Sequence, residues 1–457
     1  RPITRQLRGV AKAVWWPATP WHLLARWRAI RGRQPVASET SSAGAPGQLD
    51  LNLYPDLGVG QHLFPPMGPV QASRTHRPRL ALDTYVLAQG IKTGVYRVCD
   101  ELFPLLASSD RLDCRLFVRP HDEAKTAVLT RRFGAPAHLA PSGRPSEDAD
   151  VLLSPFGLVP PGWRLDDKVL HAHVVYDLIG VTNPEYFSAE AAVEVKRIMD
   201  SLDQQTVIFA ISEFTKNALL SYRSGLSERQ VTVVPLAAGS RFHPCEGALQ
   251  RAAVRAKYGI PSGVPYILSL ATLEIRKNLD QVVHALVSHL EECTDSELHL
   301  VLSGMSGWKL EQLDEALAKY ARWRHRIVLT GFVEDADLSA LYSDAVCFAY
   351  LSRAEGFGLP PLEAMACGTP VICANNTSLP EVVGQAGLLF DADDVQGVAH
   401  AMGRIASSPA LRRELAEAGL DRARLFSWER CADIIVNTLL AAYAERCSGR
   451  LVPVDEV

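Results

Sequence analysis

The chain has 457 residues, of which 47% are hydrophobic and 21% are charged. This composition is typical of a soluble globular protein, and the length favours two domains. The formal net charge of −4 argues against a general nucleic-acid-binding protein. Nine cysteines lie singly and no run of about 20 apolar residues occurs, so we expect no zinc site, disulfide framework or transmembrane helix.

The first 76 residues differ from the rest of the chain. Residues 1–38 carry eight basic residues and no acidic one, with four tryptophans interleaved. This mixture is typical of a segment on an anionic membrane surface, although a solvated arm or a tail packed on its own protein has the same composition. Residues 39–76 are rich in Ser, Gly and Pro and favour a linker. Because the chain begins at Arg1, a longer parent polypeptide stays an open alternative.

Residues 77–240 are predicted to form a first domain in which apolar strands alternate with helices. The first strand is expected over 79–87, followed by a turn between Gly90 and Gly94 and then a helix with apolar residues at helical spacing. A second helix is expected to begin after a cap at Ser212. Further strands are predicted over 113–119, 150–155, 168–178, 206–212 and 231–237. Such alternation indicates a parallel sheet covered on both faces.

A second α/β domain is predicted over residues 241–425. The connection over 239–263 contains Pro244, Pro261 and several glycines. Five strands are expected over 266–272, 298–304, 326–332, 345–352 and 369–375. Residues 426–457 should form a last helix, capped by Ser427, that returns to the first domain, and a tail. The predicted fold class is therefore α/β, with two Rossmann-like doubly wound domains facing a central cleft.

The stretch over residues 351–391 contains two carboxylates eight positions apart. Glu355 precedes a Gly-Phe-Gly turn, and Glu363 follows two residues after a Pro-Pro pair. Since proline is tolerated in the first turn of a helix, we predict that a helix begins near Pro360. Both carboxylates would then border one helix N-terminus, which suits an anionic ligand nearby.

These residues resemble a known family. Glu355 to Gly358, Glu363 and the run 367–371 resemble the E-x7-E region of retaining GT-B glycosyltransferases of family four. The stretches 176–180 and 273–280 are similar to those of bacterial mannosyltransferases. Three more blocks of the family pattern occur in the expected order, at 212–244, 269–280 and 329–342. The resemblance covers about residues 79 to 447, and it implies the GT-B fold and a nucleotide-sugar donor.

The resemblance also implies roles for particular residues on the donor side. Arg276 and Lys277 would stabilise the charge that builds on the leaving diphosphate. Glu363 would accept hydrogen bonds from the ribose diol, and Glu355 would hold the donor sugar. Further donor contacts are expected from the backbone of seven residues: Gly94, Gly331, Phe332, Val333, Gly356, Phe357 and Gly358, with Leu359 beside them.

The first domain departs from the family pattern at one position. Tyr176 stands where the family often has a histidine before Asp177. A tyrosine, with a reference pKa of about 10, cannot act as a base near neutral pH. His173 does not replace it, because residues three apart on a strand point to opposite faces. We therefore assign Asp177 to the catalytic set and Tyr176 to donor binding, and expect His173 to be a packed strand residue.

The predicted reaction needs neither a metal ion nor a cofactor. Asp335 and Asp337 match the D-x-D motif of a metal site, but they are predicted to begin a helix, where Asp is common as a cap.

The resemblance implies that a hexose is transferred with retention of its anomeric configuration. The most specific prediction is mannose, moved from GDP-mannose to a glycan or lipid-linked saccharide in surface polysaccharide biosynthesis. The scattered single cysteines fit a reducing, cytoplasmic setting, at the inner face of the membrane if residues 1–38 bind lipid. A sugar-nucleotide epimerase on the same fold and a non-catalytic sugar-binding or nucleotide-binding protein are the alternatives.

Overall fold

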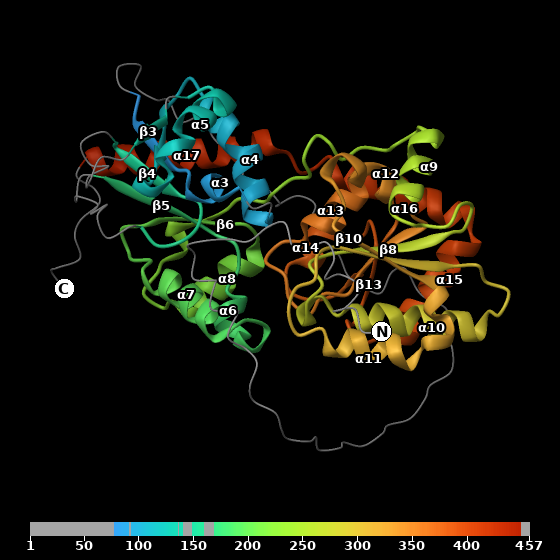
Figure 1. Ribbon diagram of the computed structural model, residues 1–457. Helices are drawn as coiled ribbons and strands as arrows, with labels where there is room; N and C mark the ends of the chain where they lie inside the picture. The colour runs from blue at the N-terminus through green and yellow to red at the C-terminus, as the bar shows by residue number, and fades with distance from the viewer. Residues whose placement is uncertain (1–76, 91–92, 136, 140–148, 160–168, 449–457) are drawn as a thin grey trace.

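A computed structural model describes residues 77–90, 93–135, 137–139, 149–159 and 169–448 (Figure 1). The predicted membrane-surface segment and linker, residues 1–76, lie outside this part of the chain and stay predictions. Among the residues that are described, no helix is both long and apolar enough to cross a bilayer.

The first sheet has seven parallel strands in the order β3-β2-β1-β4-β5-β6-β7. Its strands are β1 Arg79–Asp83, β2 Asp113–Val118, β3 Ala137–Leu139, β4 Val151–Ser154, β5 Leu170–Val175, β6 Val207–Ala210 and β7 Val231–Val233. The central strands are short, almost entirely apolar and buried, as expected for a sheet with helices on both faces.

The second sheet has six parallel strands in the order β10-β9-β8-β11-β12-β13. They are β8 Tyr266–Leu270, β9 His299–Ser303, β10 Ile327–Gly331, β11 Cys347–Tyr350, β12 Val371–Ala374 and β13 Leu388–Phe390. The strand order reverses between β1 and β4 in the first sheet and between β8 and β11 in the second. Ligands of such sheets bind outside the carboxyl ends of the strands at this reversal.

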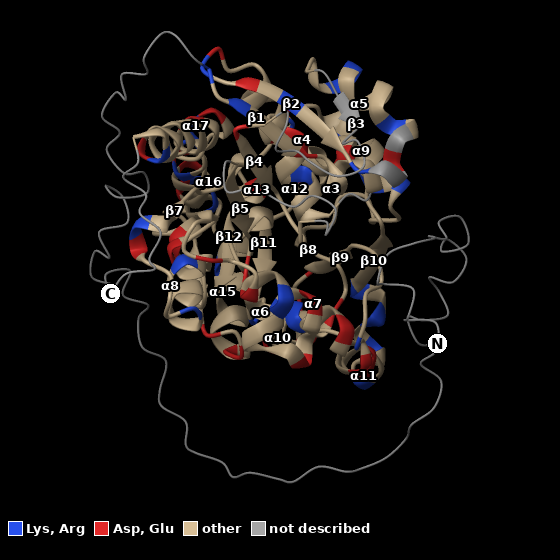
Figure 2. Cartoon of the chain, turned by 90° about the vertical axis from the view of Figure 1, so that its left-hand side faces the viewer, with Lys and Arg blue, Asp and Glu red and all other residues tan. Residues whose placement is uncertain are grey.

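The helices pack on both sheets and carry many charged residues. Figure 2 shows Lys, Arg, Asp and Glu on helices such as α7 and α11, whereas β8 and β12 have none. The helices of the first domain are α3 Tyr85–Gln89, α4 Gly94–Ala107, α5 Thr126–Phe133, α6 Ile179–Thr182, α7 Ala189–Asp200 and α8 Glu213–Tyr222. Those that follow are α9 Ala248–Lys257, α10 Leu279–Glu292, α11 Glu311–Lys319, α12 Leu338–Ser343, α13 Leu359–Ala366, α14 Leu379–Val383, α15 Val395–Ser407, α16 Pro409–Ala423 and α17 Trp428–Cys447.

Most of the predicted strands and both predicted caps are confirmed. The Ser212 and Ser427 hydroxyls accept the backbone N–H of Thr215 and Arg430, as N-caps do. The first strand was predicted too long, because the chain leaves the sheet after Asp83 and forms α3. The strands β3 and β13 were missed, since three residues are too few to show a pattern.

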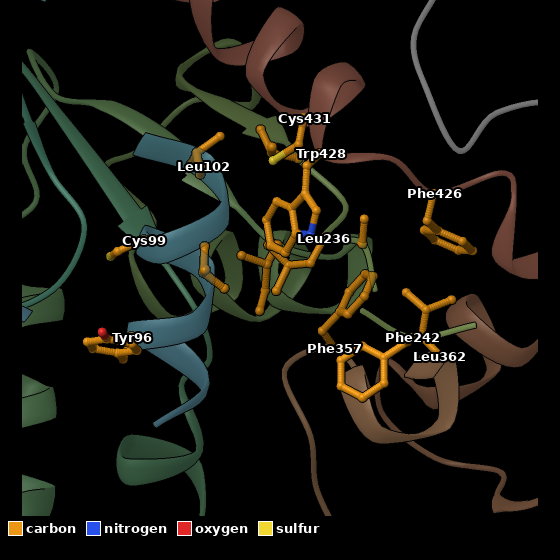
Figure 3. Packing of buried hydrophobic residues seen from close by; sticks show 14 of the residues in the cluster. Tyr96, Cys99, Leu102, Leu236, Phe242, Phe357, Leu362, Phe426, Trp428 and Cys431 are labelled. Carbon is orange, nitrogen blue, oxygen red and sulfur yellow. The ribbon is translucent and has the colours of Figure 1, made fainter. Parts of the chain in front are cut away.

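The last helix crosses back to the first domain. Helix α17 packs on α4, β5 and β6, although the residues before it belong to the second domain (Figure 1). Figure 3 shows Trp428 pointing from α17 toward Leu236 of the connection between the domains. We call the buried apolar residues at this junction the hinge cluster: Leu236, Phe242, Phe357, Leu362, Phe426 and Trp428. The Phe357 and Phe426 rings meet edge to face at 5.9 Å, so one core joins the two domains.

Replacing Trp428 with alanine tests this junction. The indole is 7% exposed, and truncating a buried Trp to Ala costs about 3–5 kcal/mol in the free energy of unfolding. We expect urea unfolding followed by circular dichroism to show a loss of this size. Leu249→Ala, at an 89% exposed position, should change the same quantity by no more than about 0.5 kcal/mol. Equal effects of the two substitutions would contradict the packing described for α17.

Candidate active site

The backbone of the loop between β11 and α13 is held by hydrogen bonds from Ser378, which lies just before α14. The Ser378 hydroxyl donates to the carbonyl oxygens of Glu355 at 2.9 Å and Phe357 at 2.7 Å. Gly358 adopts a φ of 128°, which L-residues with a side chain rarely reach. Helix α13 then begins at Leu359 with prolines in its first turn, so the predicted helix start is confirmed within one residue. The loop therefore presents Glu355 in one fixed position.

Glu355 lies between two buried cations. Lys277 Nζ is 2.5 Å from Glu355 Oε1, and Arg276 Nη1 is 3.0 Å from Oε2. Tyr350 donates to the same Oε1 at 2.8 Å. Arg276 is also fixed by Glu274 Oε1 at 2.7 Å and by the Ala354 carbonyl at 2.6 Å. Three residues that the sequence assigned to the donor side are thus in direct contact.

The charges in this cluster keep the carboxylate ionised. Burial alone would raise the pKa of Glu355, but Arg276 and Lys277 outweigh it and lower that pKa to about 2. Burial and the neighbouring Arg276 lower the pKa of Lys277, while Glu355 opposes them. Among the contacts of the described residues, Arg276 donates three hydrogen bonds from its five N–H groups and forms an ion pair with Glu355, and Lys277 uses two of its three donors. At least one donor on each cation remains for a ligand.

The first domain meets this loop at Tyr176 and Asp177. A Cβ placed on Gly356 would lie 1.9 Å from the Tyr176 carbonyl oxygen, so only glycine fits there. Asp177 accepts a hydrogen bond from the Ile179 N–H at 2.9 Å. Burial raises the pKa of Asp177, and Arg276 gives the largest opposing effect. The structure therefore brings Asp177 to the cluster formed by Glu355 and its two cations.

The side chain of Tyr176 does not face the loop. Its hydroxyl is buried beside the Cys99 thiol of α4, and burial raises its pKa well above the usual value. Its ring meets Phe156 edge to face at 6.3 Å. The carbonyl, and not the hydroxyl, is the group of this residue nearest Gly356. His173 is 1% exposed and packs against His171, and burial lowers its pKa to about 3.

Glu363 lies in α13 and is 2% exposed. Its Oε1 accepts from Arg97 Nη1 at 3.0 Å, and its Oε2 accepts from the Tyr342 hydroxyl at 3.1 Å. Arg97 lies in the first turn of α4 in the first domain, three residues after Gly94, and we did not predict a role for it from the sequence. Gly94, which was predicted to approach the donor, is the first residue of α4, and a Cβ there would meet nothing within 4 Å.

The predicted base contacts form the end of β10 and the turn after it. Gly331 has a φ of 70°, Phe332 is 49% exposed and Val333 is buried.

The two carboxylates of the D-x-D motif, Asp335 and Asp337, form ion pairs with different partners. Asp335 pairs with Arg97 at 3.2 Å and Arg241 at 3.3 Å, and Asp337 pairs with Lys257 at 2.6 Å. Within the described ranges, no three His, Cys, Asp or Glu side chains are grouped to hold a metal ion.

The N-terminus of α8 fastens the first domain to the second. The Ser212 hydroxyl donates to the Gly356 carbonyl at 2.7 Å. The backbone N–H groups of Glu213 and Phe214 donate to the two carboxylate oxygens of Glu381 at 2.8 Å and 2.7 Å. A carboxylate at a helix N-terminus is stabilised by the helix dipole. These contacts close the two domains on each other beside Glu355, and only the Ser212 cap was foreseen.

Comparison with known proteins agrees with this geometry. The family described as Glycosyl transferases group 1 matches residues 250–422. O-antigen chain mannosyltransferase B of Escherichia coli is 37% identical over 279 residues, which cover 60% of this chain and 70% of that protein. Serotype-specific mannosyltransferase WbdA of Escherichia coli is 32% identical over 268 residues, which cover 58% of this chain and 32% of WbdA, so this chain spans about a third of that relative.

A solved structure shares the arrangement of the two sheets. Sucrose-phosphate synthase of Thermosynechococcus elongatus superposes with a TM-score of 0.59 at 20% identity, over 82% of this chain and 100% of that chain. Identity this low shows a common fold alone. Taken with the sequence matches, it shows that this chain has the GT-B fold and belongs to the family of group 1 glycosyltransferases.

Proposed function

We propose that the chain transfers mannose from GDP-mannose, with retention of configuration, to a glycan or lipid-linked saccharide acceptor. The observation that carries this proposal is the buried cluster of Arg276, Lys277 and Glu355, which faces Asp177 across the domain boundary. The names of the two Escherichia coli relatives, both mannosyltransferases, support mannose as the transferred sugar.

The two cations suit a diphosphate leaving group. Negative charge builds on the phosphate oxygen as the glycosidic bond breaks, and fixed donors aimed at that oxygen lower the barrier. Arg276 and Lys277 are held rigidly by carboxylates, a carbonyl and Tyr350, and each keeps at least one N–H donor. Because their positions are set before the donor arrives, no reorganisation is needed during the reaction. In this proposal the two cations do the work that a metal ion does in other transferases.

The remaining groups hold the sugar and the ribose. Glu355 stays ionised and can accept hydrogen bonds from sugar hydroxyls, and Glu363 can accept them from the ribose diol. In the proposed step the acceptor oxygen bonds to the anomeric carbon as the bond to the phosphate breaks. The acceptor proton passes to the departing phosphate on the same face, so no protein nucleophile is required and the configuration is retained.

The acceptor would enter from the first domain. A lipid-linked saccharide requires the protein to work at a membrane surface, and the basic, tryptophan-containing residues 1–38 have a composition that suits such a surface. These residues lie outside the described part of the chain, so this contact rests on their sequence alone.

Arg276→Ala should slow the chemical step. Removing one preorganised donor to a developing negative charge costs about 10²–10³ in kcat, which is about 2.7–4 kcal/mol. The loss is measured at saturating donor on protein whose fold is checked by circular dichroism. Arg322→Ala removes an exposed ion pair with Glu291 and should change kcat by no more than about twofold. A kcat for Arg276→Ala equal to that of the control would contradict the role of this cation.

The donor is tested by nucleotide binding and by product analysis. A ligand that binds only the native state raises stability by RT ln(1 + [L]/Kd), about 2.7 kcal/mol at a hundredfold excess over Kd. We expect GDP to raise the unfolding temperature more than UDP or dTDP. With GDP-mannose and a mannose oligosaccharide acceptor, proton NMR should show a product with the anomeric configuration of the donor.

Three outcomes would contradict the proposal in different ways. Transfer from a UDP-sugar but not from GDP-mannose would show that the donor is wrong. Conversion of the donor sugar without any acceptor would identify an epimerase. Nucleotide binding without turnover, unchanged by Glu355→Gln, would identify a binding protein.

A further inference from the structure

Arg97 joins the two domains through two ion pairs that are partly buried. It lies in α4 of the first domain, yet its Nη1 reaches Glu363 Oε1 at 3.0 Å and its Nη2 reaches Asp335 Oδ1 at 3.2 Å in the second. The Glu363 side chain is only 3% exposed. Among the described residues, Arg97 is the cation within ion-pair distance of this carboxylate. A contact of this kind forms only while the domains are closed.

The surroundings of Glu363 make it depend on this arginine. Tyr342 of α12 donates to the other carboxylate oxygen, and Arg241 of the connection is a more distant cation. Asp335 faces the carboxylate across Arg97, and the Cys367 thiol lies near it at the end of α13. Burial raises the pKa of Glu363, and Arg97 is the largest opposing influence. Without Arg97, the carboxyl group would be buried without a partner in ion-pair contact, which favours its neutral form.

The carboxylate can still accept further hydrogen bonds. Two carboxylate oxygens offer about four acceptor positions, and Arg97 and Tyr342 occupy one each. Two positions suit the two hydroxyls of a ribose, which is the role proposed above for Glu363. Arg97 would leave this role intact and would fix the direction in which the carboxylate points.

A second chain of contacts ties the arginine to the connection between the domains. Asp335 also pairs with Arg241 at 3.3 Å, and Arg241 pairs with Glu101 of α4 at 3.1 Å. The same helix therefore reaches the second domain directly through Arg97 and indirectly through the connection. Opening of the domains would separate Arg97 from Glu363.

We propose that Arg97 is a positioning residue for donor binding, which holds and orients Glu363 from the opposite domain so that the nucleoside diphosphate is bound tightly only when the domains are closed. This inference rests on the proposed function, because it takes Glu363 as the group that binds the ribose. It adds that affinity for the donor depends on closure through one arginine of the acceptor domain.

The test compares Arg97→Ala, Arg97→Lys and a matched control between pH 5 and 9. The control, Arg132→Ala, removes a cation of α5 that pairs with Asp100 of α4, the helix that also carries Arg97. For Arg97→Ala we expect the donor KM to rise by at least about tenfold, because one member of a buried pair is lost, while kcat at saturating donor changes far less. The acid limb of kcat/KM should move to higher pH, since Glu363 would protonate more easily. Arg97→Lys should restore part of the loss, and Arg132→Ala should resemble the wild type.

A double substitution separates positioning from a merely structural effect. In a Glu363→Gln background the carboxylate is gone, so adding Arg97→Ala should cause no further shift of the acid limb and little further rise in donor KM. Additive losses in the double variant, or a wild-type donor KM and pH profile for Arg97→Ala, would overturn the inference.

Nucleotide binding distinguishes failure of this inference from failure of the proposed function. If GDP raises the unfolding temperature of the wild type and of Arg97→Ala equally, the inference is wrong and the function stands. If GDP, UDP and dTDP all leave the wild type unchanged and no sugar is transferred, the proposed function itself fails. The expected result is a shift with GDP in the wild type that is much smaller in Arg97→Ala.

Discussion

The candidate site is built around a cluster of buried charges beyond the carboxyl ends of β8 and β11. Two cations, Arg276 and Lys277, and two carboxylates, Glu274 and Glu355, lie in contact within it. Removing such groups from water is costly, and the ion pairs recover that cost only when their geometry is good. As evidence for stability such a cluster is therefore weak. Its placement at the strand ends, with at least one donor left on each cation, suits the diphosphate site proposed above.

Closure of the domains completes the cluster. Gly356 has no side chain and therefore lets the loop touch the Tyr176 carbonyl, which brings Asp177 to Glu355. The N-terminus of α8 forms hydrogen bonds with the same loop and with Glu381. The hinge cluster, which includes Trp428 of α17, forms a core shared by the two domains. The two sides of the domain boundary are thus held by separate contacts that all require the same relation between the domains.

The features that could be predicted are those carried by neighbouring residues. The strands follow from short apolar runs, and Arg276, Lys277 and Glu355 follow from local motifs at strand ends. Arg97 could not be predicted, because its partner Glu363 is 266 positions away and an arginine in a helix is ordinary. The same holds for Glu381, whose contact with α8 exists only in the folded, closed chain. The direction of the Tyr176 side chain was also hidden, since the residue lies just past the end of β5, where strand alternation no longer applies.

A crystal structure with GDP bound would test the central claim most directly. We predict that the diphosphate oxygens lie within hydrogen-bond distance, about 2.7–3.2 Å, of Arg276 and Lys277, with the ribose hydroxyls on Glu363 and Arg97 still in contact with that carboxylate. A nucleotide bound elsewhere, for example in the cavity of about 460 Å³ beside Arg241 and His243, would contradict the account.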